Sequence, residues 1–511
     1  MISFLSLLLV ATASAQQTWT VGQQVKTTSG QVTGHASSTA KEVSEYLGIR
    51  YGQTTGGSNR FMAPKKYTGN ETIVAAKFVS RHCQLEAAHT NSEYSQRNGC
   101  PEYYGGLLSA VGGLAAAFAL RGEDCLFLNV WSKPQTGDKK KAVMIWILGG
   151  GFSLGETSIY DGALLAEAED VVVVSMNYRT NMFGFPGAPG IPDQNVGLLD
   201  QRLAVEWARD NIAQFGGDPT KMIIFGESAG GSSVDYYNYM WPKDPIVKGF
   251  IAQSGTVHMG IYPTNKFAPL TLQAREKTWY NVSATLGCGG PEAGGPASLK
   301  CVQSKPATDV TKAIPSTSGV DGVVGFFGPT IDNKYVHSAE DYDKIDASAG
   351  FTKLPLLVGS NHNESVLFRF MAGGQAKPEE LLGIDQSFRC GAAKAAAARS
   401  NKQIPVWRYH FADTDGSASG AALYSAIGLP GFGATHSTDV QPVFGKGKLA
   451  KTFQTAWGAF AKDPQNGLSK LGWPKYDPKG NTLVRIANNG SLTPDFVKST
   501  MYDGYCADFK G

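Results

Sequence analysis

A serine between two glycines, directly after an apolar run, constrains this chain more than any other feature. The run 222–225 (MIIF) leads into Gly226, Ser228 and Gly230 in the pattern G-x-S-x-G. Small residues at the outer positions permit a sharp strand-to-helix turn that pushes the serine hydroxyl out of a sheet. A chain with 61 glycines produces this pattern by chance roughly once in every few such sequences. Other segments must therefore decide between a reactive serine and an ordinary turn.

A second glycine-rich segment follows another apolar run, 142–148 (AVMIWIL). At Gly149, Gly150 and Gly151 the backbone can approach a ligand without Cβ atoms in the way. Backbone N–H groups placed in this manner stabilise a developing oxyanion by roughly 3 to 4 kcal/mol per donor. We expect the donors to be Gly150, Gly151 and Ala229, the residue after the serine. A flexible glycine turn is the alternative.

Short apolar runs alternate with longer helical patterns along most of the chain. The runs are 171–174, 222–225, 250–252, 354–358 and 406–409, and the helical patterns include 201–215 and 450–461. Continuous apolar runs are typical of parallel strands buried on both faces. The sequence predicts an α/β fold with a large, mostly parallel central sheet and helices on both faces. The candidate site spans 149–436, which favours one domain over 16–511 rather than the two to four suggested by length.

Further motifs lie in a fixed order around these segments. They are 46–51 (YLGIRY), 123–130 (EDCLFLNV), 177–179 (NYR), 195–201 (NVGLLDQ), 215–219 (FGGDP) and 253–255 (QSG). With them the chain resembles the type-B carboxylesterases, the α/β-hydrolase family that includes the cholinesterases and certain fungal lipases. The resemblance implies ester hydrolysis by a serine without a cofactor. Leu148 departs from it, because many relatives carry His or Tyr before the three glycines.

A serine hydroxyl needs a neutral imidazole to take its proton and an acid to orient that imidazole. His436, in 433–439 (GATHSTD), is similar to the family's catalytic-histidine loop. Glu364 follows the buried run 354–360, and the order Ser228, Glu364, His436 is that of α/β-hydrolases. His362 is the rival base. A base of ordinary pKa predicts activity that rises through about pH 6 to 7.

The resemblance also implies residues around the substrate. Glu227 is expected in the polar wall of the gorge, and Ser254 is expected to hydrogen-bond the catalytic acid. A structural role is the alternative for both. Val323, Phe326 and Phe327 resemble the acyl-pocket region of cholinesterases. Val323 leaves more room there than an aromatic side chain, which predicts tolerance of larger acyl groups.

The first residues predict a secretory signal peptide. Residues 1–10 (MISFLSLLLV) are apolar and lead to Ala13-Ser14-Ala15, a small-x-small cleavage pattern. A membrane anchor is the alternative, although the run is too short to span a bilayer. We expect residues 1–15 to be removed and the mature chain to be secreted into the extracellular medium.

Because disulfides form in secreted proteins, we expect most of the 7 cysteines to be paired. By resemblance, the expected pairs are Cys288–Cys301 and Cys83–Cys125, with Cys100 as the alternative partner of Cys125. Cys390 and Cys506 are the remaining pair, and Cys100 is expected to be the odd thiol. No cysteines have the close spacing of structural zinc sites, so no metal is expected. Asn70, Asn281 and Asn489 lie in N-glycosylation sequons. Asn363 does too, but it adjoins Glu364 and is expected to be bare.

These features predict a serine carboxylic-ester hydrolase that acts through an acyl-enzyme on small-molecule esters with apolar or bulky groups. An interfacial lipase is the first alternative, and a non-catalytic, cholinesterase-like binding protein is the second. The apolar segment 107–120 is expected to be either a buried helix or a flap that faces a lipid interface. A formal charge of +3 without a basic cluster argues against nucleic-acid binding. No feature points to an obligate protein partner.

Overall fold

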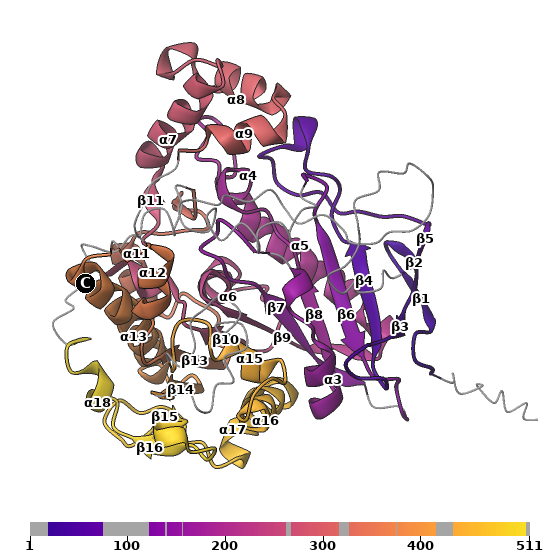
Figure 1. Ribbon diagram of the computed structural model, residues 1–511, viewed down its shortest axis with the longest axis vertical. Coiled ribbons are helices and arrows are strands. Elements are labelled where there is room, and N and C mark those ends of the chain that lie inside the picture. The colour runs from indigo at the N-terminus through magenta and orange to yellow at the C-terminus, as the bar shows by residue number, and fades with distance from the viewer. Residues whose placement is uncertain are drawn as a thin grey trace, which may run out of the picture.

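The computed structural model describes residues 19–74, 122–137, 140–155, 157–261, 267–315, 327–374, 376–414 and 433–506. Within these ranges, one large sheet runs through the molecule between flanking helices, and a group of helices projects from one end (Figure 1). Segments 75–121 and 415–432, which include the predicted flap 107–120, lie outside the described residues.

Eleven strands of the described residues form the large sheet. In spatial order they are β16 (Asp495–Val497), β15 (Leu483–Ile486), β14 (Val406–Phe411), β13 (Leu356–Asn361), β10 (Phe250–Gln253), β9 (Gly217–Glu227), β7 (Lys141–Ile147), β8 (Val172–Met176), β6 (Phe127–Ser132), β4 (Ser44–Arg50) and β3 (His35–Ala36). Two small sheets stand beside it, one of β1 (Gln24–Thr27), β2 (Gly30–Thr33) and β5 (Thr72–Val74), the other of β11 (Leu270–Thr271) and β12 (Thr330–Ile331).

In the middle of the large sheet, each neighbouring pair of strands is parallel. In spatial order, these strands are β8, β7, β9, β10, β13, β14 and β15. Antiparallel pairs follow at both edges, β15 with β16 on one side and β8, β6, β4 and β3 on the other. Every residue of β7, β8 and β10 is buried, because these strands are covered on both faces. The predicted fold class is confirmed.

The helices and their bounds are α3 (Ala163–Glu169), α4 (Asn181–Gly184), α5 (Val196–Asn211), α6 (Ala229–Met240), α7 (Leu272–Thr285), α8 (Gly295–Ser304), α9 (Ala307–Ala313), α11 (Ala339–Ser348), α12 (Ser365–Met371), α13 (Pro378–Ser400), α15 (Val440–Val443), α16 (Ala450–Lys462), α17 (Gly467–Lys470) and α18 (Thr500–Asp503). The helical pattern 201–215 corresponds to α5 followed by a 3-10 turn, η4 (Ile212–Phe215). It ends at Gly216, whose φ of 82° is the left-handed conformation that glycine adopts most easily.

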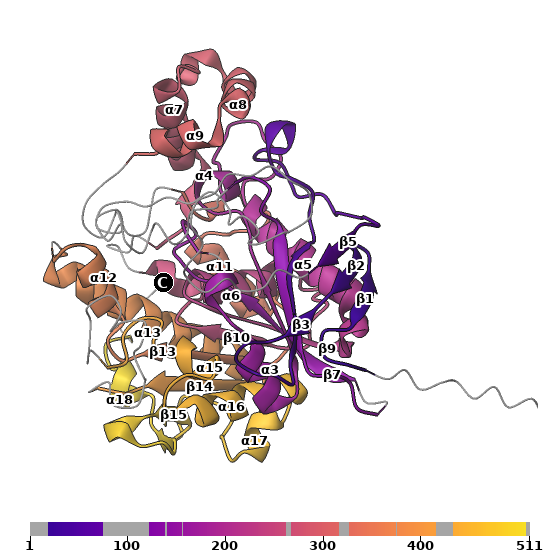
Figure 2. The ribbon, with the colours of Figure 1, turned by 45° about the vertical axis from the view of Figure 1, so that its right-hand side comes forward.

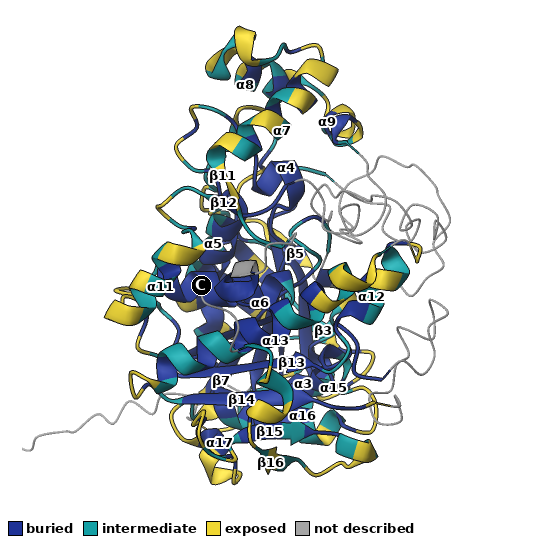
Figure 3. Ribbon diagram, turned by 90° about the vertical axis from the view of Figure 1, so that its left-hand side faces the viewer, coloured by how far each residue is buried: buried dark blue, intermediate teal, exposed yellow. Residues whose placement is uncertain are grey.

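Two pairs of helices sandwich the middle of the sheet. α5 and α6 pack against each other and on β7 to β10, whereas α3 and α16 pack against each other and on β6 to β9. Because the strands between them are buried on both faces, the two pairs cover opposite faces. Figure 3 shows the result as a dark, buried centre within a mostly exposed shell.

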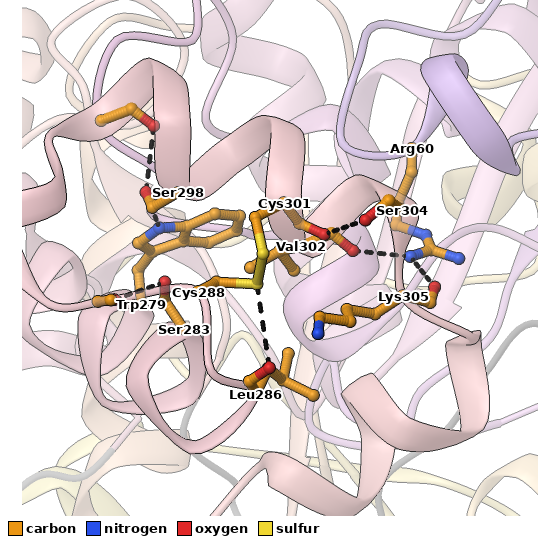
Figure 4. The surroundings of a disulfide bond; sticks show 12 residues. Arg60, Trp279, Ser283, Leu286, Cys288, Ser298, Cys301, Val302, Ser304 and Lys305 are labelled. Atoms are coloured by element: carbon orange, nitrogen blue, oxygen red, sulfur yellow. Dashed lines mark hydrogen bonds between the residues drawn. A yellow bond between two sulfur atoms is a disulfide. The ribbon is translucent and has the colours of Figure 1, made fainter.

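The helices α7, α8 and α9 form the projecting group (Figure 2). They share a small apolar core with Phe61 and α4 of the main body, and this core includes the fully buried Trp279. The disulfide Cys288–Cys301 joins α8 to the turn after α7, beside Trp279 (Figure 4). Arg60 anchors the group from the main body, because its Nη1 donates to the carbonyls of Val302 and Lys305 at 2.9 and 2.6 Å.

A second disulfide, Cys390–Cys506, ties α13 to the end of the chain. Both pairs are those expected from the sequence. Cys125 is disulfide-bonded as well, and its two candidate partners, Cys83 and Cys100, lie outside the described residues. Among the helices that the structure describes, none combines the length and the apolar character needed to cross a bilayer.

Candidate active site

Ser228 occupies a strained turn between β9 and α6. Its φ of 58° and ψ of −123° lie where residues with a side chain are rarely found, at a typical cost of about 1 to 3 kcal/mol. The flanking glycines make the turn possible. A Cβ on Gly226 would lie 2.6 Å from the backbone of Gly230, and a Cβ on Gly230 would lie 2.0 Å from the carbonyl oxygen of Ile147. The G-x-S-x-G pattern is therefore a steric requirement of this turn.

A chain of hydrogen bonds runs from Ser228 to Glu364. His436 Nε2 lies 2.8 Å from Ser228 Oγ, and His436 Nδ1 lies 2.7 Å from Glu364 Oε2. Glu364 is fully buried and His436 is 3% exposed, whereas Ser228 is only half-buried. A proton on Nδ1 bonds to the carboxylate and leaves the Nε2 lone pair facing the serine hydroxyl. This arrangement can withdraw a proton from the hydroxyl.

Two further donors hold the Glu364 carboxylate. Ser254 Oγ donates to Oε1 at 2.7 Å, and the backbone N–H of Asn361 donates to the same oxygen at 2.6 Å. The turn after β13 also pairs directly with the histidine loop, because the N–H of Asn363 donates to the carbonyl of Ala434. These contacts bring Glu364 and His436 together although 72 residues separate them.

Glu227 is a second carboxylate beside the imidazole. Its Oε1 lies 3.3 Å from His436 Nε2 and accepts a hydrogen bond of 2.6 Å from Ser437 Oγ. Burial raises the pKa of Glu227 to about 7. Burial alone lowers the pKa of His436, but the adjacent Glu227 and Glu364 carboxylates outweigh it and raise this pKa to about 9. The imidazole is thus more basic than the ordinary value assumed from the sequence.

The glycine loop lies against the serine turn. A Cβ on Gly149 would come within 3.1 Å of Ser228 Cβ. Gly150 and Gly151 have φ values of 110° and 61°, and the carbonyl of Gly150 accepts from the N–H groups of Ser153 and Leu154. Their own N–H groups make no hydrogen bond with the described residues. As the first residue of α6, Ala229 has no acceptor within its helix. None of the three predicted oxyanion donors thus has a backbone acceptor among the described residues.

An aromatic wall flanks the imidazole. The ring centroids of Phe368 and Phe388 lie 5.0 and 4.6 Å from that of His436, and Phe267 packs against both phenylalanines. Phe368 comes from α12, the helix that begins immediately after Glu364, whereas Phe388 comes from α13. This wall confines the imidazole and gives the described part of the site an apolar side.

A buried polar network connects the histidine loop to the central sheet. Asp439 Oδ2 accepts from Tyr409 Oη at 2.6 Å and from Gln253 Nε2 at 3.0 Å. Asn361 Nδ2 donates to the carbonyl of Thr435 at 2.7 Å. Asp439 is fully buried three residues after His436. These hydrogen bonds fasten the histidine loop to β10, β13 and β14.

The remaining predicted site residues have different surroundings. His362 faces His410, with 3.3 Å between Nδ1 and Nε2, rather than the serine. Phe327 is buried in the core of the projecting helices. Val323 and Phe326 lie outside the described residues. A role for Val323, Phe326 and Phe327 in an acyl pocket stays a prediction.

Several supporting residues carry no recognisable signal in the sequence. They are Asn361, Phe388, Asp385, Ser437 and Asp439. Asp385 lies on α13, yet it accepts two hydrogen bonds from Ser365, the residue after Glu364. Spacing along the chain does not reveal such contacts. Only the position of Ser437 and Asp439 beside His436 offers a hint.

A serine, a histidine and a carboxylate gathered at the carboxyl ends of parallel strands define this protein as an α/β-hydrolase. A family model described as the carboxylesterase family matches residues 21–383. The chain therefore belongs to the carboxylesterase family and is a carboxylic-ester hydrolase.

The chain is similar to several proteins of known type, of which three follow. A chlorogenic acid esterase of Aspergillus niger is 30% identical over 95% of this chain and 94% of its own length. Secreted lipase 5 of Gibberella zeae is 29% identical over 98% and 97% of the two chains. A cholinesterase of Mus musculus is 32% identical over 68% of this chain and 55% of its own.

Proposed function

We propose that Ser228, His436 and Glu364 act as nucleophile, base and orienting acid of an ester hydrolase that forms an acyl-enzyme. The continuous hydrogen-bonded chain from Ser228 Oγ to Glu364 Oε2 carries the proposal. An imidazole in contact with both a hydroxyl and a buried carboxylate has the geometry that nucleophilic catalysis by serine requires.

In the first half-reaction, His436 Nε2 takes the proton of Ser228 as Oγ attacks the ester carbonyl carbon. The N–H groups of Gly150, Gly151 and Ala229 stabilise the resulting oxyanion. His436 then gives the proton to the alcohol oxygen as the carbon–oxygen bond breaks. In the second half, His436 deprotonates a water that attacks the acyl-enzyme, and Ser228 is restored.

We further propose that the substrates carry apolar or bulky groups. Phe368 and Phe388 flank the imidazole that must protonate the leaving alcohol, so an apolar alcohol portion meets hydrocarbon there. An interfacial lipase is the second candidate, because a relative aligned over 98% of the chain is named a lipase. Another relative is named a chlorogenic acid esterase, so esters other than lipids are candidate substrates as well.

We also propose that the protein is secreted as one catalytic domain over 16–511 after loss of a signal peptide at 1–15. The two disulfides support an oxidising location, and one relative is named a secreted lipase. Asn70, Asn281 and Asn489 are exposed and thus accessible to glycosylation, whereas Asn363 is half-buried.

Replacing Ser228 tests the proposal. Ser228→Ala should lower kcat by about 10⁵ to 10⁶, as removal of a triad nucleophile does elsewhere, with little change in thermal unfolding. Ser232→Ala, one turn further along α6, is the matched control and should keep activity within a few-fold. An organophosphate should label Ser228 and no other serine. Near-normal activity of Ser228→Ala would refute the assignment.

The substrate class needs a separate measurement. We would compare p-nitrophenyl esters of increasing acyl length in solution with emulsified triacylglycerols. Preference for soluble bulky esters would support the esterase, and a sharp rise in rate on the emulsion would support the lipase. Exclusive hydrolysis of acetyl esters would contradict a substrate with apolar or bulky groups.

A further inference from the structure

His258, Asp343 and Asp346 form a cluster away from the proposed triad. His258 belongs to the 3-10 turn η5 (Val257–Ile261), and the two aspartates lie one turn apart on α11. Each side chain offers one ligand atom, and these atoms all lie within 4.8 Å of one another. Cysteine spacing, on which the expectation of no metal is based, has no bearing on this cluster.

The spacing of the donor atoms suits a small metal ion. His258 Nε2 lies 3.3 Å from Asp346 Oδ2. Zinc binds imidazole nitrogen and carboxylate oxygen at about 2.0 to 2.2 Å, which places two ligands of a tetrahedral ion about 3.3 to 3.5 Å apart. Asp343 and Asp346 are three positions apart on α11 and project from the same side of the helix. The ligand atom of Asp343 lies within 4.8 Å of the other two, a gap that a side-chain rotation can close.

Tyr239 orients these groups. Its hydroxyl donates to Asp346 Oδ1 at 2.6 Å and lies 3.3 Å from His258 Nε2. A carboxylate held through one oxygen presents the other oxygen in a defined direction, as ligating carboxylates in metal sites do. His258 is only 3% exposed, and its Nε2 faces both the Tyr239 hydroxyl and Asp346 Oδ2, so the position of this nitrogen is fixed.

The charges around the cluster do not balance. Arg399 pairs with Asp235 at 3.0 Å, and both side chains are fully buried. Lys394 forms an ion pair with Asp343 Oδ1, and the charges of Arg399 and Lys394 both act on Asp346. Among the described residues of this region, the carboxylates of Asp235, Asp343 and Asp346 thus outnumber the cations Arg399 and Lys394, and a bound cation can neutralise the excess negative charge.

Lys394 occupies the place beside Asp343 Oδ1 that an ion would take. Asp343 Oδ1 accepts no hydrogen bond from the described residues although Lys394 is in contact with it. The side chains of Lys394 and Asp343 are 28% and 30% exposed although Asp343 Oδ1 itself is buried, so solvent reaches the edge of the cluster on this side. The lysine can leave through the same opening by which an ion would enter.

We propose that His258, Asp343 and Asp346 bind a divalent zinc-like ion, which displaces Lys394 from Asp343. The bound ion would join α11 to the turn after β10, the strand whose end leads to Ser254. Its role is structural, because none of the three ligands contacts the proposed triad. Imidazole and carboxylate donors favour zinc over magnesium, which prefers oxygen ligands and retains its water.

The test uses the full-length protein after treatment with a chelator and measures binding of ZnCl₂ by calorimetry and by the shift in Tm. We expect one site in the wild type that Asp343→Asn weakens at least tenfold. Glu340→Gln, a change at an 81% exposed side chain of the same helix, is the matched control and should bind as the wild type does. MgCl₂ at the same concentration should not raise Tm.

Lys394→Met distinguishes a metal site from a simple ion-pair network. If the lysine competes with the ion, its removal should tighten zinc binding several-fold. Absence of zinc binding in the wild type, equal binding by Asp343→Asn, or weaker binding by Lys394→Met would each overturn the proposal. Asp343 and Lys394 are partly exposed, so these variants should fold.

Discussion

Glu227 directly precedes Ser228 along the chain, but its side chain reaches the imidazole of His436. The imidazole therefore has two carboxylate neighbours, Glu364 on Nδ1 and Glu227 near Nε2. In the proposed mechanism, Glu364 orients the ring along the line of proton transfer, whereas Glu227 acts mainly through its charge. The raised pKa of His436, about 9, follows from both neighbours.

At the residue scale, we expect Glu227→Gln to shift the pH dependence of kcat/KM. An opposite charge within about 4 to 6 Å typically raises a base's pKa by about 1 unit or more, so loss of the charge should lower the pKa of His436 by a similar amount. Because the neutral imidazole is the active form, activity should then rise at a lower pH than in the wild type. Profiles measured from pH 5 to 10 test this.

Glu364→Gln serves as the contrasting variant, because it should reduce kcat severely at every pH rather than move the profile. A profile of Glu227→Gln that stays in place or moves to higher pH would contradict the electrostatic role of Glu227.

At the scale of elements, α13 holds the start of α12. Asp385 accepts from the backbone N–H of Ser365 at 2.9 Å and from its hydroxyl at 2.7 Å. Glu364 is the N-cap residue of α12, directly before Ser365. The position of the acid therefore depends on a side chain from another helix, about 20 residues further along the chain.

We expect Asp385→Ala to lower kcat by about 10- to 100-fold with little change in KM, since an error of about 1 Å in a catalytic group has such effects. It should also reduce the free energy of unfolding by about 1 to 3 kcal/mol, because a buried backbone donor loses its acceptor. Ser365→Ala keeps the backbone bond and should be much milder. Equal kcat in Asp385→Ala and the wild type would show that α12 needs no such support.

At the scale of the whole molecule, the end of the chain closes over the sheet. The disulfide Cys390–Cys506 and the ion pair Arg408–Asp503 fasten the α18 region. The ring of Tyr502 lies against that of His410, with 3.9 Å between the centroids and a tilt of 34°, and His410 in turn faces His362. Burial, followed by the nearby Arg389, His362, Arg408 and Arg485, lowers the pKa of His410 well below 6.5.

This closure predicts loss of stability in acid. The unfolded chain takes up protons on His410 and His362 near pH 6.5, but the folded protein keeps both imidazoles neutral because both pKa values are lowered. The unfolded state thus binds more protons than the folded state below about pH 6.5. The free energy of unfolding therefore decreases as the pH is lowered below this value, and the two histidines do not change it at higher pH. The change in Tm between pH 7 and pH 5 should be smaller in His410→Phe. An identical change in both proteins would contradict this.

Local patterns in the sequence were enough for the frame of the molecule. Continuous apolar runs predicted β7, β8, β9, β10, β13 and β14, because burial on both faces leaves no polar alternation. The strand β9 begins at Gly217, before its apolar run. The sequence did not reveal this start, because residues 218–221 are at least partly exposed and carry no apolar signal. Glycines around Ser228 revealed the strained turn for a steric reason that is equally local.

What the sequence determined by itself is what short segments decide: strands, the serine turn and its glycines, and the residues that match the family's motifs. The tertiary structure decided which of these groups meet, since Ser228 and His436 are 208 residues apart and come together only when the sheet is assembled. It also decided the contacts of Glu227, Asp385 and His410. Burial and neighbouring charge set the basicity of His436, and both depend on residues that the fold, rather than the chain order, brings into contact.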